Sequence, residues 1–279
     1  MAITLEPSTS TTTKTNRDQK ATYAGTKIIS AAKVHKRLKM CLYARNKVGK
    51  TVFACSSGLK TLVIDCNERG YDSVQAYGNV DIYEAARWED IDPIYWYLRN
   101  GNHPYEVVVI DTVTMMMSMG IKWVLKDDLE RDMSRDPMMP SRPTYLKNGE
   151  ILKDAIIKFR NLPYHIIFCA QEKTSADEDD EGNTVIETHP ELSPAPRSVL
   201  LSATNLVGRM YVAETTNKAG KKVMERRILL GARPKYVAGG RFPQLRAIER
   251  LKPEPYPNLG DFLTRIYGES KNAKASSSK

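Results

Sequence analysis

The chain contains 279 residues, of which 41% are hydrophobic, which is enough for one large domain or two small ones. Its formal net charge of +9 favours a polyanionic partner, and its four cysteines lack metal-site spacing and predict buried, reduced thiols. Because neither a signal peptide nor an apolar stretch of about 18 residues is evident, we expect a cytoplasmic protein with no membrane partner, neither secreted nor membrane-spanning.

Polar, low-complexity segments at 1–20 and 269–279 are predicted to be disordered, with one ordered domain over residues 21–268. Apolar runs alternate there with helical patterns, which predicts an α/β fold with a mostly parallel sheet flanked by helices. The C-terminal third instead predicts antiparallel strands around a turn at 217–220. In chain order we expect a strand at 38–43, a helix at 50–58, a strand at 61–65, a helix at about 93–100 capped by Asp92, a strand at 106–111, a helix at 113–130, a loop at 131–144, a helix at about 145–161, a strand at 165–170, and strands at 207–215 and 222–230.

The stretch from Ala44 to Thr51 has the spacing of a Walker A phosphate loop, G-x-x-x-x-G-K-[ST], with alanine in place of the first glycine. It lies between a predicted strand and a predicted helix, where backbone N–H groups can cradle a polyphosphate. Lys50 would neutralise the β and γ oxygens, and the Thr51 hydroxyl would ligate Mg²⁺. The expected nucleotide-binding residues are Ala44, Arg45, Asn46, Lys47, Val48, Gly49, Lys50, Thr51 and Val52.

Asp111 ends the apolar run 107–110, which predicts a Walker B strand whose carboxylate holds Mg²⁺ directly or through water. A helix N-cap or an ordinary loop carboxylate is the alternative. The next residue is Thr112 and not a second acid, so the group that polarises the attacking water must lie elsewhere. Glu68, three residues beyond Asp65, is the candidate general base, and a solvated loop acid is an equal alternative.

Gln171 directly follows the predicted strand at 165–170. At the tip of a strand beside the phosphate loop, its amide could hydrogen-bond the γ-phosphate and report its presence to the next loop. A plain surface glutamine is the alternative.

These features together resemble the RecA/KaiC-like ATPase core: a phosphate loop, an acid after the second strand, a lone Walker B aspartate followed by threonine, and a glutamine-tipped strand. More narrowly, the run from Pro163 to Lys173, the acidic hairpin after it and the following basic segment resemble phage-encoded AAA-type RecA-like proteins, which include single-strand annealing recombinases. The resemblance covers residues 25–250. It implies an ATPase that uses ATP and Mg²⁺, binds single-stranded DNA, forms a homo-oligomeric ring or filament, and acts beside a single-stranded-DNA-binding protein in the host cytoplasm.

Two departures from the RecA pattern bear on hydrolysis. Ala44 replaces the usual first glycine, and Asn67 occupies the position of the catalytic glutamate, with Glu68 one residue further on. Either the loop shifts by one residue so that Glu68 serves, or hydrolysis is weak and ATP acts as a switch.

The resemblance also implies two DNA-binding loops. The first would contact the DNA backbone and stack on bases, and an ordinary surface loop is the alternative; its expected contacts are Arg131, Arg135, Arg142 and Tyr145. The second is acidic, so we expect DNA contacts at its base, from Lys173 and Arg197, instead of at its tip.

Residues 217–252 contain eleven Lys or Arg residues against two acids. The alternatives for this segment are a solvated face, a polyanion groove or a subunit interface. In RecA-like filaments, basic residues of the neighbouring subunit reach the γ-phosphate and stabilise transition-state charge. Lys235 and Arg241 resemble these trans cations by their position after the late strand.

The sequence therefore favours an ATPase that binds single-stranded DNA and supports homologous recombination or single-strand annealing. One alternative is a regulatory or helicase-loading P-loop NTPase that acts on a replication protein. The other is a non-hydrolysing, ATP-switched oligomer, which Asn67 favours.

Overall fold

The computed structural model describes residues 37–134, 136, 138–178, 181–216, 220–250 and 258–268, together with two short strands. These strands, β1 (Thr22–Tyr23) and β2 (Thr26–Lys27), pair antiparallel in a unit that ends at Lys36, and every other element belongs to a second unit that begins at Arg37. The two segments expected to be disordered, 1–20 and 269–279, lie outside the described residues, as do Arg135 and most of the expected turn at 217–220.

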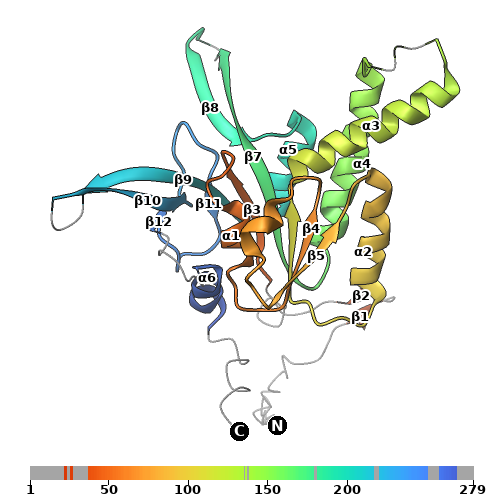
Figure 1. The fold of residues 1–279 in the computed structure, drawn as a ribbon. Helices are drawn as coiled ribbons and strands as arrows, with labels where there is room; N and C mark the ends of the chain where they lie inside the picture. The colour runs from red at the N-terminus through yellow and green to blue at the C-terminus, as the bar shows by residue number, and fades with distance from the viewer. Residues whose placement is uncertain are drawn as a thin grey trace, which may run out of the picture. The chain divides into compact units, whose positions relative to one another are not determined.

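A ten-stranded sheet forms the centre of the second unit (Figure 1). β3 (Lys39–Ala44) pairs in parallel with β7 (His165–Glu178) on one side and with β9 (Leu206–Thr216) on the other. Beyond β7 the sheet continues in parallel through β6 (Val107–Asp111), β4 (Thr61–Asp65) and β5 (Val80–Glu84).

Antiparallel strands extend the sheet on the other side of β3. They are β10 (Lys222–Leu229), which pairs with β9, and the short β12 (Ile248–Arg250), which pairs with β10. β8 (Thr184–Pro190) forms a hairpin with β7, and β11 (Gly239–Gly240) pairs with β9. The expected fold class, an α/β fold with a mostly parallel sheet and antiparallel strands in the C-terminal third, is confirmed.

Helices cover both faces of the sheet. Successive side chains of each strand point to opposite faces, so each face carries its own apolar cluster that helices bury. In β3, Met40 and Leu42 belong to one apolar cluster, while Cys41 and Tyr43 belong to the other. The first cluster packs against α1 (Lys50–Cys55) and α6 (Asn258–Tyr267), and the second against α2 (Ile91–Asn100), α3 (Val113–Arg131), α4 (Arg142–Arg160) and α5 (Pro194–Ala203). Two short 3₁₀ helices, η2 (Gly70–Val74) and η3 (Trp88–Asp90), follow β4 and β5. All four cysteines are buried and free, as expected.

The loop expected at 131–144 is shorter than predicted, because α4 begins at Arg142. Ser141 caps this helix. Its hydroxyl accepts a hydrogen bond from the Thr144 N–H, and the Thr144 hydroxyl accepts one from the Ser141 N–H. Pro143 fits the first turn, where no intrahelical bond needs its missing N–H. Because of this cap, the helix begins at Arg142 instead of at about residue 145.

Other elements were missed or misplaced. α2 begins at Ile91, so the predicted cap at Asp92 is wrong; Asp90, the residue before the helix, instead accepts from the Ala86 and Arg87 N–H groups. β5, α5 and α6 were not predicted, and β7 runs eight residues beyond the predicted end at 170. The longer β7 projects with β8 from the same side of the sheet as the α3–α4 hairpin, while the β9–β10 hairpin projects sideways (Figure 1).

Candidate nucleotide-binding site

The phosphate loop joins the carboxyl end of β3 to α1. Lys47 and Gly49 adopt left-handed backbone conformations, with φ of 64° and 106°, which turn the chain sharply between strand and helix. Arg45, Asn46 and Lys47 are exposed, so the loop is open to a ligand. Ala44 is still part of β3, where it is fully buried and paired with Gln171. An alanine is therefore tolerated, because the left-handed turns come after it.

Thr51 and Asp111, the two residues predicted to hold Mg²⁺ and called the metal pair below, are in direct contact. The Thr51 hydroxyl donates to Asp111 Oδ2 at 2.6 Å, and both side chains are buried. Burial raises the pKa of Asp111 to about 6, although the Thr51 hydrogen bond and the Lys50 charge lower it in part. A hydroxyl and a carboxylate fit Mg²⁺, which prefers oxygen ligands and would offset the cost of burying this charge.

Gly70, which the sequence analysis did not identify, keeps this pair accessible. A Cβ atom on Gly70 would lie 2.8 Å from both Asp111 Oδ2 and Thr51 Oγ1. In the described part of the chain, no group of three or more His, Cys, Asp or Glu residues could hold a metal ion. Metal binding at Thr51 and Asp111 would therefore depend on oxygens from phosphate and water as well.

Gln171 connects the phosphate-loop lysine to the candidate base. Its Oε1 accepts from Lys50 Nζ at 3.1 Å, and its Nε2 donates to Glu68 Oε1 at 2.8 Å. The Thr112 hydroxyl donates to the same oxygen of Glu68 at 3.0 Å. Lys50 is 7% exposed, and its remaining hydrogen bonds, both 3.4 Å long, go to the carbonyls of Ala44 and Arg45. The structure thus brings together Lys50, Glu68 and Gln171, three of the residues predicted to be catalytic.

A comparison with protein families identifies the domain that carries this site. Residues 36–242 match the model of a family described as an AAA domain. The chain belongs to this AAA-domain family. No curated protein matches it. Among solved structures, the flagellar accessory protein FlaH from Methanocaldococcus jannaschii is similar, at 10% identity and a TM-score of 0.36, over 78% of this chain and 86% of FlaH. That likeness is too weak to bear on function, and the resemblance to phage recombinases stays a prediction.

The basic β10 strand contacts the phosphate loop of the AAA domain within the same chain. Arg226 Nε donates to the carbonyl of Val48 at 3.0 Å, and a Cβ on Gly49 would lie 3.5 Å from that nitrogen. Arg226 was not predicted as a site residue, because only the β9–β10 pairing brings it to the loop. On the other side of the loop, Arg45 lies 3.4 Å from Glu172, which also binds Arg209 through both carboxylate oxygens.

Backbone hydrogen bonds place the two predicted trans cations, Lys235 and Arg241. The Lys235 carbonyl accepts from Thr188 in β8, and the Arg241 N–H donates to the carbonyl of Asn205, whose own N–H donates to Lys39. Arg241 therefore sits at the amino end of β3, and at about 3.3 Å per residue the loop is roughly 16 Å away, beyond the reach of an arginine side chain. A role in cis is excluded for Arg241, and its role in trans stays a prediction.

The predicted DNA-contacting residues of the AAA domain lie on the α3–α4 hairpin, on β7 and on α5. Arg131 ends α3 and pairs with Asp127 at 3.0 Å, while Arg142 and the half-exposed Tyr145 lie in the first turn of α4. Lys173 is exposed on β7, whereas the Arg197 guanidinium on α5 is hydrogen-bonded to the His189 ring. The structure thus groups three of these residues on one hairpin, without testing their role; Arg135 lies outside the described residues.

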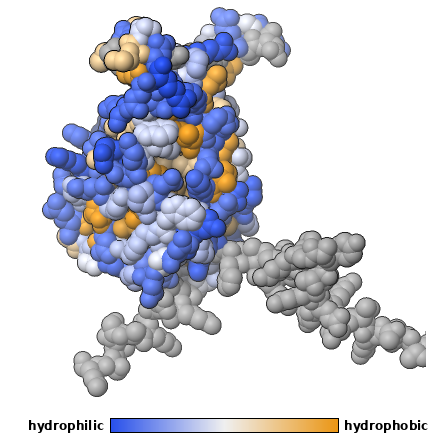
Figure 2. All heavy atoms as spheres, turned by 90° about the vertical axis from the view of Figure 1, so that its right-hand side faces the viewer, coloured by the Kyte–Doolittle hydropathy of each residue, from blue (hydrophilic) through white to orange (hydrophobic). Residues whose placement is uncertain are grey.

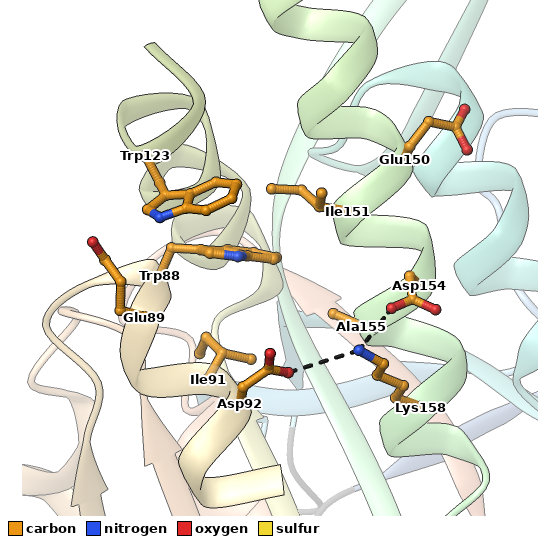
Figure 3. A pocket seen from close by; sticks show the side chains of 10 residues that line it. All are labelled: Trp88, Glu89, Ile91, Asp92, Trp123, Glu150, Ile151, Asp154, Ala155 and Lys158. Atoms are coloured by element: carbon orange, nitrogen blue, oxygen red, sulfur yellow. Dashed lines mark ion pairs between the residues drawn. The ribbon is translucent and has the colours of Figure 1, made fainter. Parts of the chain in front are cut away.

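A separate hollow of about 700 Å³ lies between η3, α2, α3 and α4 (Figure 3). Trp88 and Trp123 provide apolar walls, and Lys158 pairs with Asp154 at 2.8 Å and Asp92 at 3.7 Å beside them. Figure 2 shows hydrophobic surface in the middle of this face of the molecule, among hydrophilic surroundings. None of the predicted nucleotide, metal or DNA contacts lines this hollow, so it is not part of the nucleotide site.

No helix among the described residues is long and apolar enough to cross a membrane.

Proposed function

We propose that this AAA domain hydrolyses ATP with Mg²⁺ and binds single-stranded DNA, acting as an oligomer in homologous recombination or single-strand annealing. The observation that carries hydrolysis is the Lys50–Gln171–Glu68 chain beside the Thr51–Asp111 pair. It joins Lys50, the cation expected to contact the phosphates, to Glu68, a carboxylate that could orient water.

In the proposed reaction the phosphates of ATP occupy the loop, and Lys50 offsets charge on the β and γ oxygens. Thr51 and Asp111 would hold Mg²⁺, and the ion would supply positive charge to offset the charge that develops on those oxygens. Glu68 orients a water for in-line attack on the γ-phosphorus and accepts its proton. The bond from the γ-phosphorus to the β–γ bridging oxygen breaks as the new bond forms, and ADP and phosphate are the products. Gln171 contacts Lys50 and Glu68 at once, so a γ-phosphate that draws Lys50 away would also change the hydrogen bonding of Glu68.

DNA binding would involve Arg131, Arg142 and Tyr145 on the α3–α4 hairpin. Lys173 on β7 and Arg197 on α5 would contribute further contacts. Lys173 lies two residues after Gln171 on the same strand. A contact at Lys173 could therefore shift the Gln171 amide, which supports the expectation that DNA stimulates hydrolysis. A single-stranded-DNA-binding protein is a further expected partner.

A second candidate function, regulation or loading of a replication protein, is favoured by the tip of the α3–α4 hairpin. Met133, Met138 and Met139 are 92%, 83% and 71% exposed there. Exposed methionines suit adaptable protein contacts. This alternative predicts nucleotide-dependent binding of a protein partner and ATP turnover that ignores DNA.

The test is ATP hydrolysis by the full chain, with and without single-stranded DNA, beside Lys50→Ala. Removing one transition-state donor costs about 10²- to 10³-fold in turnover, so we expect the variant to be nearly inactive. Strong DNA stimulation of the wild type supports the recombination ATPase. Turnover that DNA does not change favours the protein-partner function, and ATP binding without turnover leaves an ATP-switched oligomer.

A further inference from the structure

Arg226 is an arginine at the phosphate loop to which the reaction proposed above gives no role. β9 runs parallel to β3, with Arg209 opposite Tyr43, so the residues of β9 after Arg209 extend toward the loop that follows β3. β10 accompanies β9 in this direction, and Arg226 pairs there with Val212. The hairpin thus brings a basic strand beside the nucleotide end of the sheet.

The Arg226 side chain lies against the phosphate loop itself. Its Nε donates to the Val48 carbonyl at 3.0 Å, and its Nε and Cδ lie 3.5 and 3.9 Å from the position that a Cβ on Gly49 would take. The terminal methyl group of Met210 in β9 lies 3.5 Å from the same position. Val48 and Gly49 belong to the stretch whose backbone N–H groups are expected to cradle the phosphates. The guanidinium therefore borders the expected phosphate position.

The charge of Arg226 is not offset by a carboxylate among the described residues. Its hydrogen bond to the loop carbonyl uses one of the five N–H groups of the guanidinium. The next residue, Arg227, is instead paired with Glu225 at 2.7 Å. Because the Arg226 side chain is also exposed, its charge and its terminal nitrogens are accessible to an anion in the loop.

We infer that Arg226 binds the phosphates of the nucleotide in cis, from the same subunit as Lys50. This inference rests on the proposed function, because it requires a nucleoside triphosphate in the loop. The planar guanidinium matches two phosphate oxygens at once, so its terminal nitrogens contact phosphate while Nε keeps its bond to the Val48 carbonyl. Arg226 thereby gives the basic C-terminal segment a cation at the nucleotide in cis, a role that is excluded for Arg241.

The first test is the affinity of the full-length protein for Mg-ATP, measured by calorimetry. Arg226→Gln keeps a donor for the loop carbonyl but removes the charge, and a lost hydrogen bond to a charged group should weaken binding roughly tenfold. Arg226→Lys keeps the charge without the planar fork, so we expect a loss of only about threefold. Lys222→Gln is the matched control, because Lys222 lies on the same face of β10, roughly 13 Å along the strand.

Equal affinities of Arg226→Gln and the wild type would overturn the inference. Equal losses in the glutamine and lysine variants would also overturn it, because a hydrogen bond to the loop carbonyl does not depend on a positive charge. A wild type that binds no ATP would overturn the proposed function, and this inference with it. ATP binding that is indifferent to Arg226 would overturn the inference alone.

The second test separates action in cis from action in trans. Arg226→Gln is mixed with Lys50→Ala, and ATP turnover is measured below the wild-type Kd for ATP, where turnover follows affinity. If each site needs Lys50 and Arg226 of one subunit, the mixture should reach no more than the sum of the separate variants. Turnover above that sum would show that Arg226 completes the site of a neighbouring subunit, which contradicts the cis assignment. If the wild type binds ATP without turnover, the proposed hydrolysis fails, and the affinity test still decides the role of Arg226.

Discussion

The nucleotide end of the sheet and the α3–α4 projection differ in how closely the fold determines the contacts of their side chains. At the nucleotide end, Lys50, Thr51 and Asp111 are less than 10% exposed and joined to other site residues by hydrogen bonds. On the projection, Met133 is 92% exposed, and Tyr145 is about half exposed. Buried polar groups must find partners within the chain, so their contacts suggest a chemistry. Exposed groups lack this constraint, and only a partner molecule can reveal their role.

The largest effect should come from closing the space at the metal pair with Gly70→Ala. Its new methyl group would lie 2.8 Å from Thr51 Oγ1 and Asp111 Oδ2. Overpacking costs about 1–3 kcal/mol, so we expect Mg-ATP affinity to fall roughly 10- to 100-fold, as measured by calorimetry. Gly78→Ala is the matched control, because no atom lies within 4 Å of its Cβ position. Equal affinities of the two variants would show that Gly70 does not border the metal site.

An intermediate effect should come from the pH dependence of stability without Mg²⁺. Burial raises the pKa of Asp111 to about 6, above its unfolded value of 3.8, so the native state binds more protons than the unfolded state between these values. This contribution to stability is present at low pH and is lost as the pH rises through about 6. Relative to Asp111→Asn, the wild type should gain roughly 1 kcal/mol between pH 7.5 and 5.5, measured by urea unfolding. Parallel pH profiles of the two proteins would refute this account.

The smallest effect should come from the projection, with Arg142→Ala. Arg142 is exposed at the start of α4, so its loss should leave thermal stability and DNA-free turnover unchanged. One lost phosphate contact should reduce the salt-dependence slope of single-stranded DNA binding by about 0.7, with roughly threefold weaker binding at low salt. Fluorescence anisotropy at several salt concentrations measures both quantities. Arg87→Ala, another exposed arginine, is the control. Identical binding by the two variants would favour the protein-partner function.

The fold class, the phosphate loop and the Walker B aspartate were predictable from sequence because their signals are local. A glycine, a lysine and a threonine at fixed spacing between a strand and a helix determine the loop, and an apolar run that ends in Asp111 determines a buried strand with an acid at its tip. Gln171 was predictable for the same reason, since it directly follows such a run.

Only the tertiary structure decided which residues meet. Gln171 bonds to Glu68 because β7 and β4 flank β6, and Arg226 reaches Val48 because β10 pairs with β9; these partners are 103 and 178 residues apart in the chain. The left-handed turn after Asp65 and the space beside Gly70 likewise have no sequence signature. The sequence by itself thus determined the local elements that carry the phosphate loop, Asp111 and Gln171, and the chemistry at their tips. The geometry between those tips depends on strand order and register, which are set by burial of the whole sheet.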